Sequence, residues 1–475
     1  MDVAKARSQY PILTGPQPFI YADNAGGSQV PKTVVSRMVD YLLNTNVQVG
    51  ADYVPSKVAT RRVMEEGPTA AKILMNAASA DEIVLGASST MNVENLAQGL
   101  TGDIKAGDEI IITGEHEANG GPWKRLATRV GATTILWPHR PLHSANPYAV
   151  ALVLDDLLPL ITARTRLVAF TSCSNILGSV VPVADIVPAV RAKAKEMGAP
   201  KVEVCVDAVA YAPHKKVDVR AWDVDYCVFS CYKIYGAHVS AMYVRSDALK
   251  NSVSSVVHHF LKVPEVAYKI MPGGPGYESV YAITGVIPYL LSLTPDGEKL
   301  LEETGLLQDA TADSMPLLTN PALPAALDTS WAAIAAHDHG LLAPLLAFLT
   351  HPDQWARGVR IAGDGGAFNG QSGDEDRTVG AAFKPHVAGR APTVSFVMVE
   401  SSNGKPQLGS KQIVEYFDKK GGIGIRYGHF YAFTLVSKIA PGGDPADGVV
   451  RISLVHYNTV AEVERIIEVL KEVLA

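Results

Sequence analysis

A lysine and an aspartate in this sequence each follow an apolar run of the kind that forms a buried strand. Lys233 lies in FSCYKIYGAHVSAMYV and Asp207 in VEVCVDAVAYAP, and 26 residues separate them. A lysine desolvated in a cleft has a lowered pKa, so its amine can attack an aldehyde. A buried carboxylate needs a partner, and a protonated pyridine nitrogen is a suitable one. Each residue also has a simpler interpretation when it is considered alone. Lys233 could be a solvent-exposed cation in a loop, and Asp207 could be the N-cap of a helix.

Two further features lie where predicted strands end. His116, in GEHEANGGPW, has an imidazole that could stack on a flat ring or relay protons. Gly86–Asn92, GASSTMN, is a small-residue turn whose amides and hydroxyls would form an anion site at the start of a helix. Neither feature is specific by itself, because a loop histidine is often incidental and many turns between strand and helix look alike.

These residues can meet only if a β-sheet brings the ends of their strands together, and the apolar runs in the sequence predict such a sheet. Between residues 70 and 250 they alternate with helical stretches such as Asn92–Leu100 and Val183–Met197. The runs are almost continuously apolar, which indicates strands buried on both faces of a mostly parallel sheet. An α/β core of about seven strands is therefore predicted. The predicted strands are Glu82–Leu85, Glu109–Thr113, Thr133–Trp137, Arg166–Thr171, Val202–Val206, Asp225–Ser230 and Ser240–Val244.

After about residue 295 the pattern changes to a smaller α+β domain. Residues 301–350 are rich in Ala and Leu and predict helix, and Gly363–Arg377 predicts a surface loop. We predict an N-terminal segment 1–20, a large domain 21–295 and a small domain 296–475. The elements expected in the last part are the strands Thr393–Val399 and Val449–Leu454 and the helices Lys411–Lys419 and Val460–Leu474.

Composition limits the class of protein. Of the 475 residues, 47% are hydrophobic and 19% charged, with a net charge of −6, which excludes a disordered chain and argues against a nucleic-acid platform. No run of about 18 apolar residues is free of charge, so no membrane-spanning helix is predicted. The start, MDVAKARSQYPIL, lacks an apolar signal core. A soluble cytoplasmic protein is expected, without membrane or nucleic-acid partners.

The cysteines do not form a disulfide framework, because there are only four in the chain. Their spacing lacks a CxxC pair, which favours buried reduced thiols over zinc ligands. No metal site is predicted. The four are Cys173, Cys205, Cys227 and Cys231.

The motifs taken together resemble a known family. A small-residue turn, then EH, SN, VD and SxxK, follow one another at predicted strand ends, and the similarity runs from about Ile20 (IYADNAGGSQVP) to the C-terminus. This order is similar to that of the cysteine-desulfurase-like branch of the class V aminotransferases. The resemblance implies the type I fold of pyridoxal 5′-phosphate (PLP) enzymes, a large domain with a mostly parallel seven-stranded sheet, and a homodimer with the active site near the subunit interface.

The resemblance also implies residue roles. Lys233 would form the Schiff base with PLP and later move protons at Cα. Asp207 would pair with the pyridine nitrogen, His116 would stack on the ring, and Asn175 would form a hydrogen bond with the ring oxygen. Arg451 would clamp the α-carboxylate of the substrate as a bidentate fork. The phosphate would be held by Ser230 and by Ala87 and Ser88. Further groups on the substrate side would be Arg426, His429, Asn24 and Ala25.

The sequence departs from the family at several of these positions. The loop that carries the sulfur-accepting cysteine in desulfurases matches Arg426–Ala432, RYGHFYA, where Tyr431 replaces the cysteine. Ala210 replaces a glutamine that contacts the ring oxygen. Tyr232 replaces a histidine that contacts the phosphate, and its phenol is a possible substitute. The loop that a partner chain would contribute matches MPGGPGYES, with Tyr277 or Ser279 as weak candidates.

These departures leave several functions open. The leading interpretation is a PLP enzyme that removes the Cα proton of an α-amino acid and forms a C–C bond, as in the Mannich-type cyclases of fungal alkaloid pathways, with Tyr431 in the catalytic pocket. A cysteine desulfurase-like or C–S lyase activity and an amino-acid epimerase are the alternatives. A catalytically silent binding or scaffold protein is a further possibility, although such a protein has no need of both Lys233 and Asp207.

Overall fold

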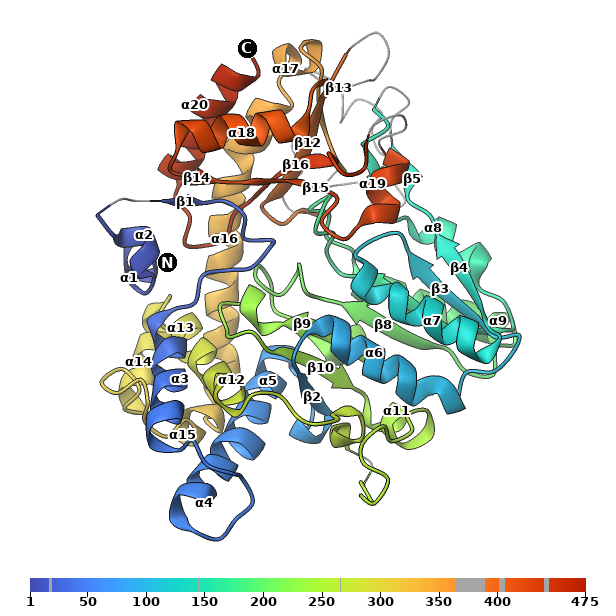
Figure 1. Cartoon of the computed structure of the whole chain (residues 1–475), viewed down its shortest axis with the longest axis vertical. Coiled ribbons are helices and arrows are strands. Elements are labelled where there is room, and N and C mark those ends of the chain that lie inside the picture. The colour runs from blue at the N-terminus through green and yellow to red at the C-terminus, as the bar shows by residue number, and fades with distance from the viewer. Residues whose placement is uncertain (17–18, 143–145, 265, 364–388, 401–405, 440–443) are drawn as a thin grey trace.

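The computed structural model describes residues 1–16, 19–142, 146–264, 266–363, 389–400, 406–439 and 444–475. Figure 1 shows a larger part built around a seven-stranded sheet, and a smaller part, coloured orange and red, that carries the C-terminus. The predicted loop at Gly363–Arg377 lies, after its first residue, outside the described residues. The predicted domain boundary after residue 295 stays a prediction.

The seven-stranded sheet confirms the predicted α/β core. Its order is β2-β10-β9-β8-β7-β3-β4, and every described pairing is parallel except those of β10, which runs antiparallel to both of its neighbours. Five of the seven strands are buried at every residue, as continuous apolar runs require. The strands are β2 Ile83–Gly86, β3 Glu109–Thr113, β4 Thr133–Trp137, β7 Thr165–Thr171, β8 Glu203–Asp207, β9 Tyr226–Ser230 and β10 Ser240–Val244.

Helices cover both faces of this sheet. On the face turned to the viewer in Figure 1, α6 (Ser89–Gly99) and α7 (Gly121–Val130) pack their apolar residues onto alternate residues of the strands. The opposite face packs against α9 (Val183–Glu196), α5 (Gly67–Met75) and α13 (Val286–Leu291). Since successive strand residues point to opposite faces, both cores draw on the same apolar runs.

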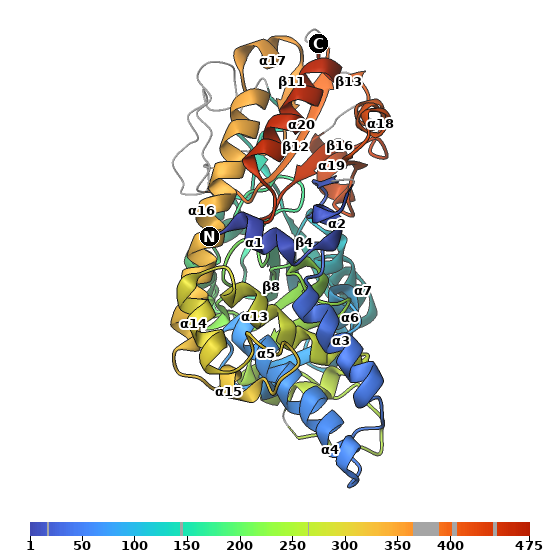
Figure 2. The same ribbon diagram turned by 90° about the vertical axis from the view of Figure 1, so that its left-hand side faces the viewer.

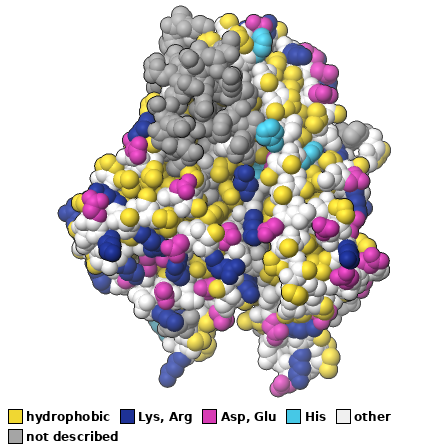
Figure 3. Space-filling view, turned by 180° about the vertical axis from the view of Figure 1, so that it is seen from behind, with side chains coloured by type: hydrophobic (Ala, Val, Ile, Leu, Met, Phe, Trp, Pro, Cys, Tyr) yellow, Lys and Arg dark blue, Asp and Glu magenta, His cyan; other side chains and the backbone are white. Residues whose placement is uncertain are grey.

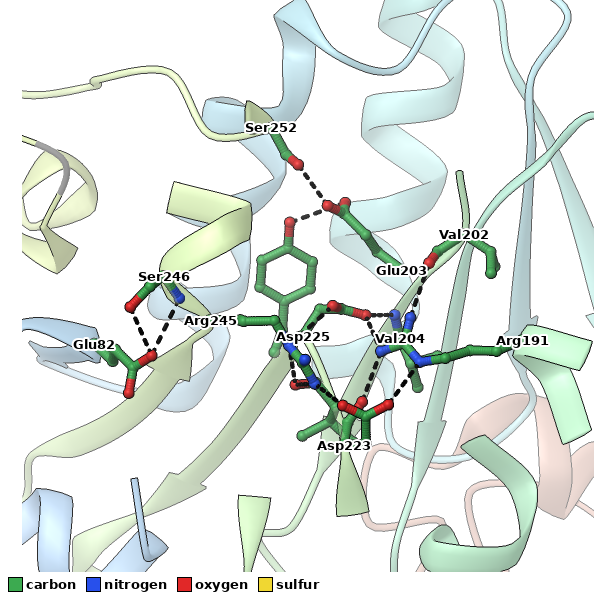
Figure 4. A network of polar contacts seen from close by, with 12 residues as sticks. Glu82, Arg191, Val202, Glu203, Val204, Asp223, Asp225, Arg245, Ser246 and Ser252 are labelled. Carbon is green, nitrogen blue, oxygen red and sulfur yellow. Dashed lines mark hydrogen bonds and ion pairs between the residues drawn. The ribbon is translucent and has the colours of Figure 1, made fainter. Parts of the chain in front are cut away.

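A polar network fixes the end of the sheet opposite the predicted site (Figure 4). Asp225 accepts a hydrogen bond from the backbone N–H of Val204 at 2.8 Å and forms ion pairs with Arg191 at 3.1 Å and Arg245 at 3.3 Å. Glu203 accepts from the Tyr226 hydroxyl at 3.0 Å. The network joins the first residues of β8 to the segment that opens β9. It therefore holds in register the two strands whose far ends lead to Asp207 and Lys233.

The smaller part has its own sheet and hydrophobic core. Its strand order is β11-β12-β16-β15, with β13 paired to β12, and α18 (Ser410–Lys420) and α20 (Val460–Val473) pack on it. The start of the chain joins this part, because β1 (Ile20–Tyr21) pairs in parallel with β14 (Ile423–Gly424). The other strands are β11 Val359–Ile361, β12 Thr393–Val399, β13 Pro406–Leu408, β15 Arg426–Gly428 and β16 Val449–Ser453.

Helix α16 (Leu323–Leu349) runs from the larger part to the smaller one, as Figures 1 and 2 show. Among the described residues it is long and apolar enough to cross a membrane by length and composition, contrary to the expectation from the sequence. Its packing accounts for this composition. Leu327 and Ile334 belong to the core of the larger part, whereas Leu341 and Leu345 belong to the core of the smaller part.

The surface carries charges of both signs, and twelve further α-helices of the described part of the chain surround the two parts. Lys and Arg side chains lie among Asp and Glu side chains over the coloured face in Figure 3, in line with the net charge of −6. The other helices are α1 Val3–Ser8, α2 Pro11–Thr14, α3 Lys32–Asn44, α4 Val54–Arg61, α8 Leu154–Leu157, α10 Val219–Trp222, α11 Ser246–Asn251, α12 Tyr277–Ala282, α14 Pro295–Glu303, α15 Met315–Leu318, α17 Pro352–Ala356 and α19 Phe433–Ile439, besides two short β-strands, β5 Arg140–Pro141 and β6 Val150–Ala151.

Candidate active site

A cavity of about 300 Å³ opens where the strands of the large sheet end. It brings together predicted residues that are widely separated in the sequence, as expected for side chains at the carboxyl ends of parallel strands. The residues that line it are Ser88, Ser89, Thr90, His116, Thr171, Cys173, Asn175, Asp207, Val209, Ala210, Tyr232, Lys233 and Tyr431.

Lys233 closes the short 3₁₀ turn Cys231–Lys233 that follows β9. The residue is buried to 6% exposure, and within the described residues no carboxylate lies within 4.0 Å of its Nζ. Burial lowers the pKa of Lys233 to about 8, with the charge of Arg451 acting in the same direction and that of Asp207 opposing it. An amine in this state carries a nucleophilic lone pair near neutral pH.

Asp207 ends β8 and is buried, and its Oδ1 accepts a hydrogen bond from the backbone N–H of Val209 at 2.9 Å. Burial raises the pKa of Asp207 to about 6, although the Val209 bond and the charge of Lys233 lower it. Above that pH it is a carboxylate in an apolar wall. Such a group is stabilised by a cationic ligand group such as a protonated ring nitrogen.

His116 stands at the end of the β3 segment as the N-cap of a short turn. Its Nδ1 accepts from the Ala118 N–H at 3.2 Å, and its ring lies 5.6 Å from that of Tyr431. Burial, with added repulsion from Lys233 and Arg451, lowers the pKa of His116 to about 4. The imidazole is therefore neutral at pH 7, which suits stacking on a flat ring better than carrying charge.

Hydroxyl residues of the predicted turn Gly86–Asn92 form one corner of the cavity. Ser88 lines the cavity and caps α6 by accepting from the Met91 N–H at 3.2 Å. Ser89 and Thr90 also line the cavity, whereas Ala87 does not. Ser230 supports this corner by donating to the Ser89 hydroxyl at 3.1 Å. The role of these residues, and of Ala87, in holding a phosphate stays a prediction.

Asn175 lines the cavity, and one end of its amide is already bonded. Its Nδ2 donates to the backbone carbonyl of Phe430 at 3.0 Å. Its Oδ1 is buried and has no hydrogen-bond partner among the described residues. Asn175 thus joins the cavity to the loop that carries Tyr431, and it retains one unsatisfied polar atom.

Arg451 and Arg426 lie side by side, but both are already paired. They are Cα partners on β16 and β15, and Asp23 forms ion pairs with both, at 3.0 Å from Oδ1 to the Nη2 of Arg451. Arg451 is buried, and the ring of Phe430 covers its Cζ at 3.7 Å. Sequence reasoning missed Asp23. The available signal was an acidic residue directly after the first apolar run.

The expectation that Asn24 faces the substrate is wrong. Its side chain is buried and donates to the carbonyls of Tyr21 and Ser453, each at 3.0 Å, while the hydroxyl of Tyr457 donates to its Oδ1. With its amide bonded at both ends, Asn24 fastens the start of the chain to the smaller part. Ala25 donates its backbone N–H to the Ser453 hydroxyl at 2.9 Å and does not line the cavity.

Two tyrosines form part of the cavity wall. Tyr431 is 71% exposed and has a left-handed backbone (φ +62°), and its carbonyl accepts from the Glu117 N–H at 2.9 Å. Tyr232 lines the cavity and stacks on His238 with ring centroids 5.0 Å apart. His429 accepts the Tyr431 N–H at 3.2 Å and does not line the cavity, so it supports the loop instead of facing the substrate.

The residues present fit the cofactor that the resemblance implied. The cavity carries a desolvated amine at Lys233, a buried carboxylate at Asp207, a neutral ring at His116 and hydroxyls at a helix N-terminus. The unsatisfied Oδ1 of Asn175 shows that this wall lacks a polar partner. An aldehyde, a ring nitrogen, a flat ring and a phosphate are the four groups that these residues would take up.

Comparison with known proteins supports this assignment. The model of the family described as aminotransferase class-V matches residues 20–293. The aminotransferase-like protein FGM3 of Gibberella zeae is 35% identical over 100% of this chain and 98% of that protein. The cysteine desulfurase-like protein ustD of Aspergillus flavus is 30% identical over 61% of this chain and 64% of its own length.

The fold is similar to that of a solved cysteine desulfurase. The apo structure of a cysteine desulfurase from Thermococcus onnurineus NA1 superposes with a TM-score of 0.71 at 22% identity, covering 99% of this chain and 98% of that one. The family match covers more than half of the chain, and the fungal relative spans all of it. The chain therefore belongs to the aminotransferase class V family, in its cysteine-desulfurase-like branch, and has the type I fold and the pyridoxal phosphate cofactor of that family.

Proposed function

We propose that this protein removes the Cα proton of an α-amino acid and joins Cα to an electrophile, as a Mannich-type cyclase of secondary metabolism. The observation that carries the proposal is that Tyr431 lines the cavity. The sequence resemblance aligns this residue with the sulfur-accepting cysteine of desulfurases. A phenol has no sulfur to hold a persulfide. The full-length similarity to a fungal aminotransferase-like protein supports a reaction on an amino acid.

The cysteine that does line the cavity is a poor substitute for the missing one. Cys173 is buried, and its Sγ lies 3.8 Å from the Ser174 carbonyl and 3.7 Å from that of Gly178. Burial raises the pKa of Cys173 to about 12, so the thiol stays protonated at pH 7 and is a weak nucleophile. The other three cysteines are free and buried, as the sequence predicted.

The residues of the site divide the work of such a reaction. Pyridoxal phosphate, when bound, supplies an electron sink for charge that develops at Cα. Asp207 would hold the proton on the ring nitrogen, and His116 would cover the ring. Lys233, with its lowered pKa, would take the Cα proton. Tyr431 and Tyr232 would present aromatic faces and hydroxyls to the electrophile.

Sulfide release separates this proposal from the desulfurase alternative, which the similarity to ustD keeps in view. We expect the loaded wild-type enzyme to release almost no sulfide from L-cysteine in the presence of a thiol reductant. Tyr431→Cys should release measurably more, because it adds an exposed thiol at the cavity. Tyr431→Phe is the control, since it keeps the ring and adds no thiol. Sustained sulfide production by the wild type would contradict the proposal.

Arg451→Lys tests whether the substrate keeps its carboxylate. Lysine retains the charge but loses the planar fork, and each lost charge-assisted hydrogen bond costs about 1.5–3 kcal/mol. We expect the dissociation constant of an α-amino acid to rise about tenfold or more, while that of the corresponding amine without a carboxylate changes little. Titration calorimetry on the loaded enzyme measures both. An equal loss for the two ligands would rule out a carboxylate clamp at Arg451.

We also propose that the protein forms a homodimer and is located in the cytoplasm. Helix α3 exposes four large apolar side chains on one face, at spacings of four, seven and eight residues, which is a pattern suited to a partner surface. The four unpaired, buried cysteines suit a reducing compartment. The four side chains on α3 are Val35, Val39, Leu42 and Leu43.

A further inference from the structure

The two arginines that the resemblance implied on the substrate side do not line the cavity, although the charges of both lower the pKa of Lys233. Their position opposite each other is unfavourable without Asp23. Arg426 and Arg451 are directly opposite each other on the antiparallel strands β15 and β16. Like charges in this arrangement repel. Asp23 pairs with both of them, so the Asp23 cluster, defined as Asp23, Arg426 and Arg451, carries one net positive charge.

The backbone around Asp23 fixes its carboxylate between the two sheets. The Ala22 N–H donates to the Gly424 carbonyl at 3.0 Å, and the Asn24 N–H donates to the Ser453 carbonyl at 3.2 Å. Asp23 itself forms a bridge with Ser453. Residues on both sides of Asp23 are therefore bonded to the smaller part, which places its carboxylate beside the two arginines.

Asp23 leaves one arginine available and occupies the other. Arg451 retains a buried Nε without a partner among the described residues, although Asn175 accepts from its Nη1 at 3.3 Å. For a carboxylate to bind at this edge, the Phe430 ring that covers the Arg451 guanidinium has to move, because Arg451 does not line the cavity as it stands. Arg426 is the more accessible cation, with 53% of its side chain exposed, but its Nε is paired with Asp23. A second carboxylate on a substrate would need this guanidinium.

We propose that Asp23 is a specificity-determining residue that makes the site accept amino acids with one carboxylate and reject dicarboxylic ones. This inference rests on the proposed function, because it assumes that an α-amino acid binds at Arg451. Asp23 holds the Arg451 fork in place for the α-carboxylate and at the same time blocks Arg426. Loss of its charge would leave a second cation within reach of a side-chain carboxylate.

The test uses the PLP-loaded enzyme and two probes, 2-methylalanine and 2-methylaspartate, which lack a Cα hydrogen and differ by one carboxylate. Titration calorimetry gives the ratio of their dissociation constants. In Asp23→Asn we expect this ratio to shift at least about tenfold towards 2-methylaspartate, and the shift to shrink at high salt. The shift should disappear in Asp23→Asn combined with Arg426→Gln, where the released cation is absent.

Asp40→Asn is the matched control. Asp40 also pairs with an arginine, Arg62, at 2.7 Å, and its side chain is 14% exposed, as is that of Asp23. The Asp40→Asn variant removes one negative charge from α3, and the ratio of the two dissociation constants should stay as in the wild type. Arg426→Gln alone adds a test that does not depend on the folding of the Asp23 variant. Because Asp23 already occupies Arg426, this variant should change the ratio less than about threefold.

The outcomes are distinguishable. An unchanged ratio in Asp23→Asn, with 2-methylalanine still bound, overturns the role of Asp23 and leaves the proposed function standing. A large loss of 2-methylaspartate binding in Arg426→Gln alone also overturns it, because Arg426 would then already serve a second carboxylate. Failure of both probes to bind the wild-type enzyme overturns the proposed function, and this inference with it.

Discussion

Lys233→Ala is expected to abolish covalent attachment of pyridoxal phosphate and to reduce removal of the Cα proton by at least about a thousandfold, because one change removes both the nucleophile and the base. The first effect is measured by borohydride reduction and peptide mapping, which should place the cofactor on Lys233 in the wild type. The second is measured by exchange of the Cα hydrogen of a panel of amino acids in D₂O. Turnover within about tenfold of wild type would show that another residue acts at this position.

Lys269→Met is the matched control for this variant. Lys269 is as buried as Lys233, at 6% exposure, but lies on the turn Ala267–Ile270 and donates to the Leu249 carbonyl. Its loss removes a buried cation without touching the cavity, so covalent labelling should persist.

The same lysine predicts a pH dependence. With a pKa of about 8, roughly half of the Lys233 amines are neutral at pH 8, whereas a lysine at 10.5 would be almost fully protonated. Attachment of the cofactor should therefore rise with pH around a midpoint near 8.

Asp207→Asn is expected to retain pyridoxal phosphate but to lower the rate of Cα exchange by about a thousandfold. An amide in place of the carboxylate cannot hold the ring nitrogen in its protonated form, so the ring withdraws fewer electrons. Asp207→Glu should recover part of the rate, because it restores a carboxylate. Wild-type exchange in Asp207→Asn would place a different acid at the ring nitrogen.

Asp225→Asn serves as the control for loss of a buried carboxylate, since Asp225 is 6% exposed and lies at the opposite end of the sheet. It should lower stability but not the exchange rate of the folded, loaded enzyme.

The pKa of about 6 for Asp207 also predicts how cofactor affinity depends on pH. Below that pH the carboxyl is protonated and loses its attraction for a cationic ring, so cofactor affinity should fall as the pH falls through 6.

Local sequence pattern was sufficient to predict the large sheet. The predicted bounds of β3, β4 and β10 agree with the structure, β7 and β9 differ by one residue at their start, and β2 and β8 are shifted by one residue at both ends. The reason is that strands buried on both faces must be apolar at every position, so their limits are visible in the sequence itself. The shared position of Lys233 and Asp207 in one cavity followed, because the carboxyl ends of parallel strands meet at one edge.

The position of Asp23 could not be predicted in this way. Its partner Arg451 lies 428 residues further along the chain, and nothing in the local pattern links them. The pairing arises because β1 pairs with β14 in a two-stranded sheet of the smaller part, and Asp23 then forms a bridge with Ser453 at the end of β16, the strand that carries Arg451. Cys173 is a similar case. The absence of cysteines near Tyr431 in the sequence is correct, but the fold brings Cys173 into the same cavity.

The sequence by itself determined the α/β core and the family, and it predicted that Lys233, Asp207 and His116 meet at one site. Each of these depends on residue type, on the order of the motifs or on apolar runs of four to six residues, which are visible along the chain. Only the tertiary structure decided that Asn24 is a structural amide and that Asp23 pairs with both Arg426 and Arg451. These depend on contacts between segments far apart in the sequence, and hydrogen bonding and charge pairing there satisfy groups that the sequence shows only as polar.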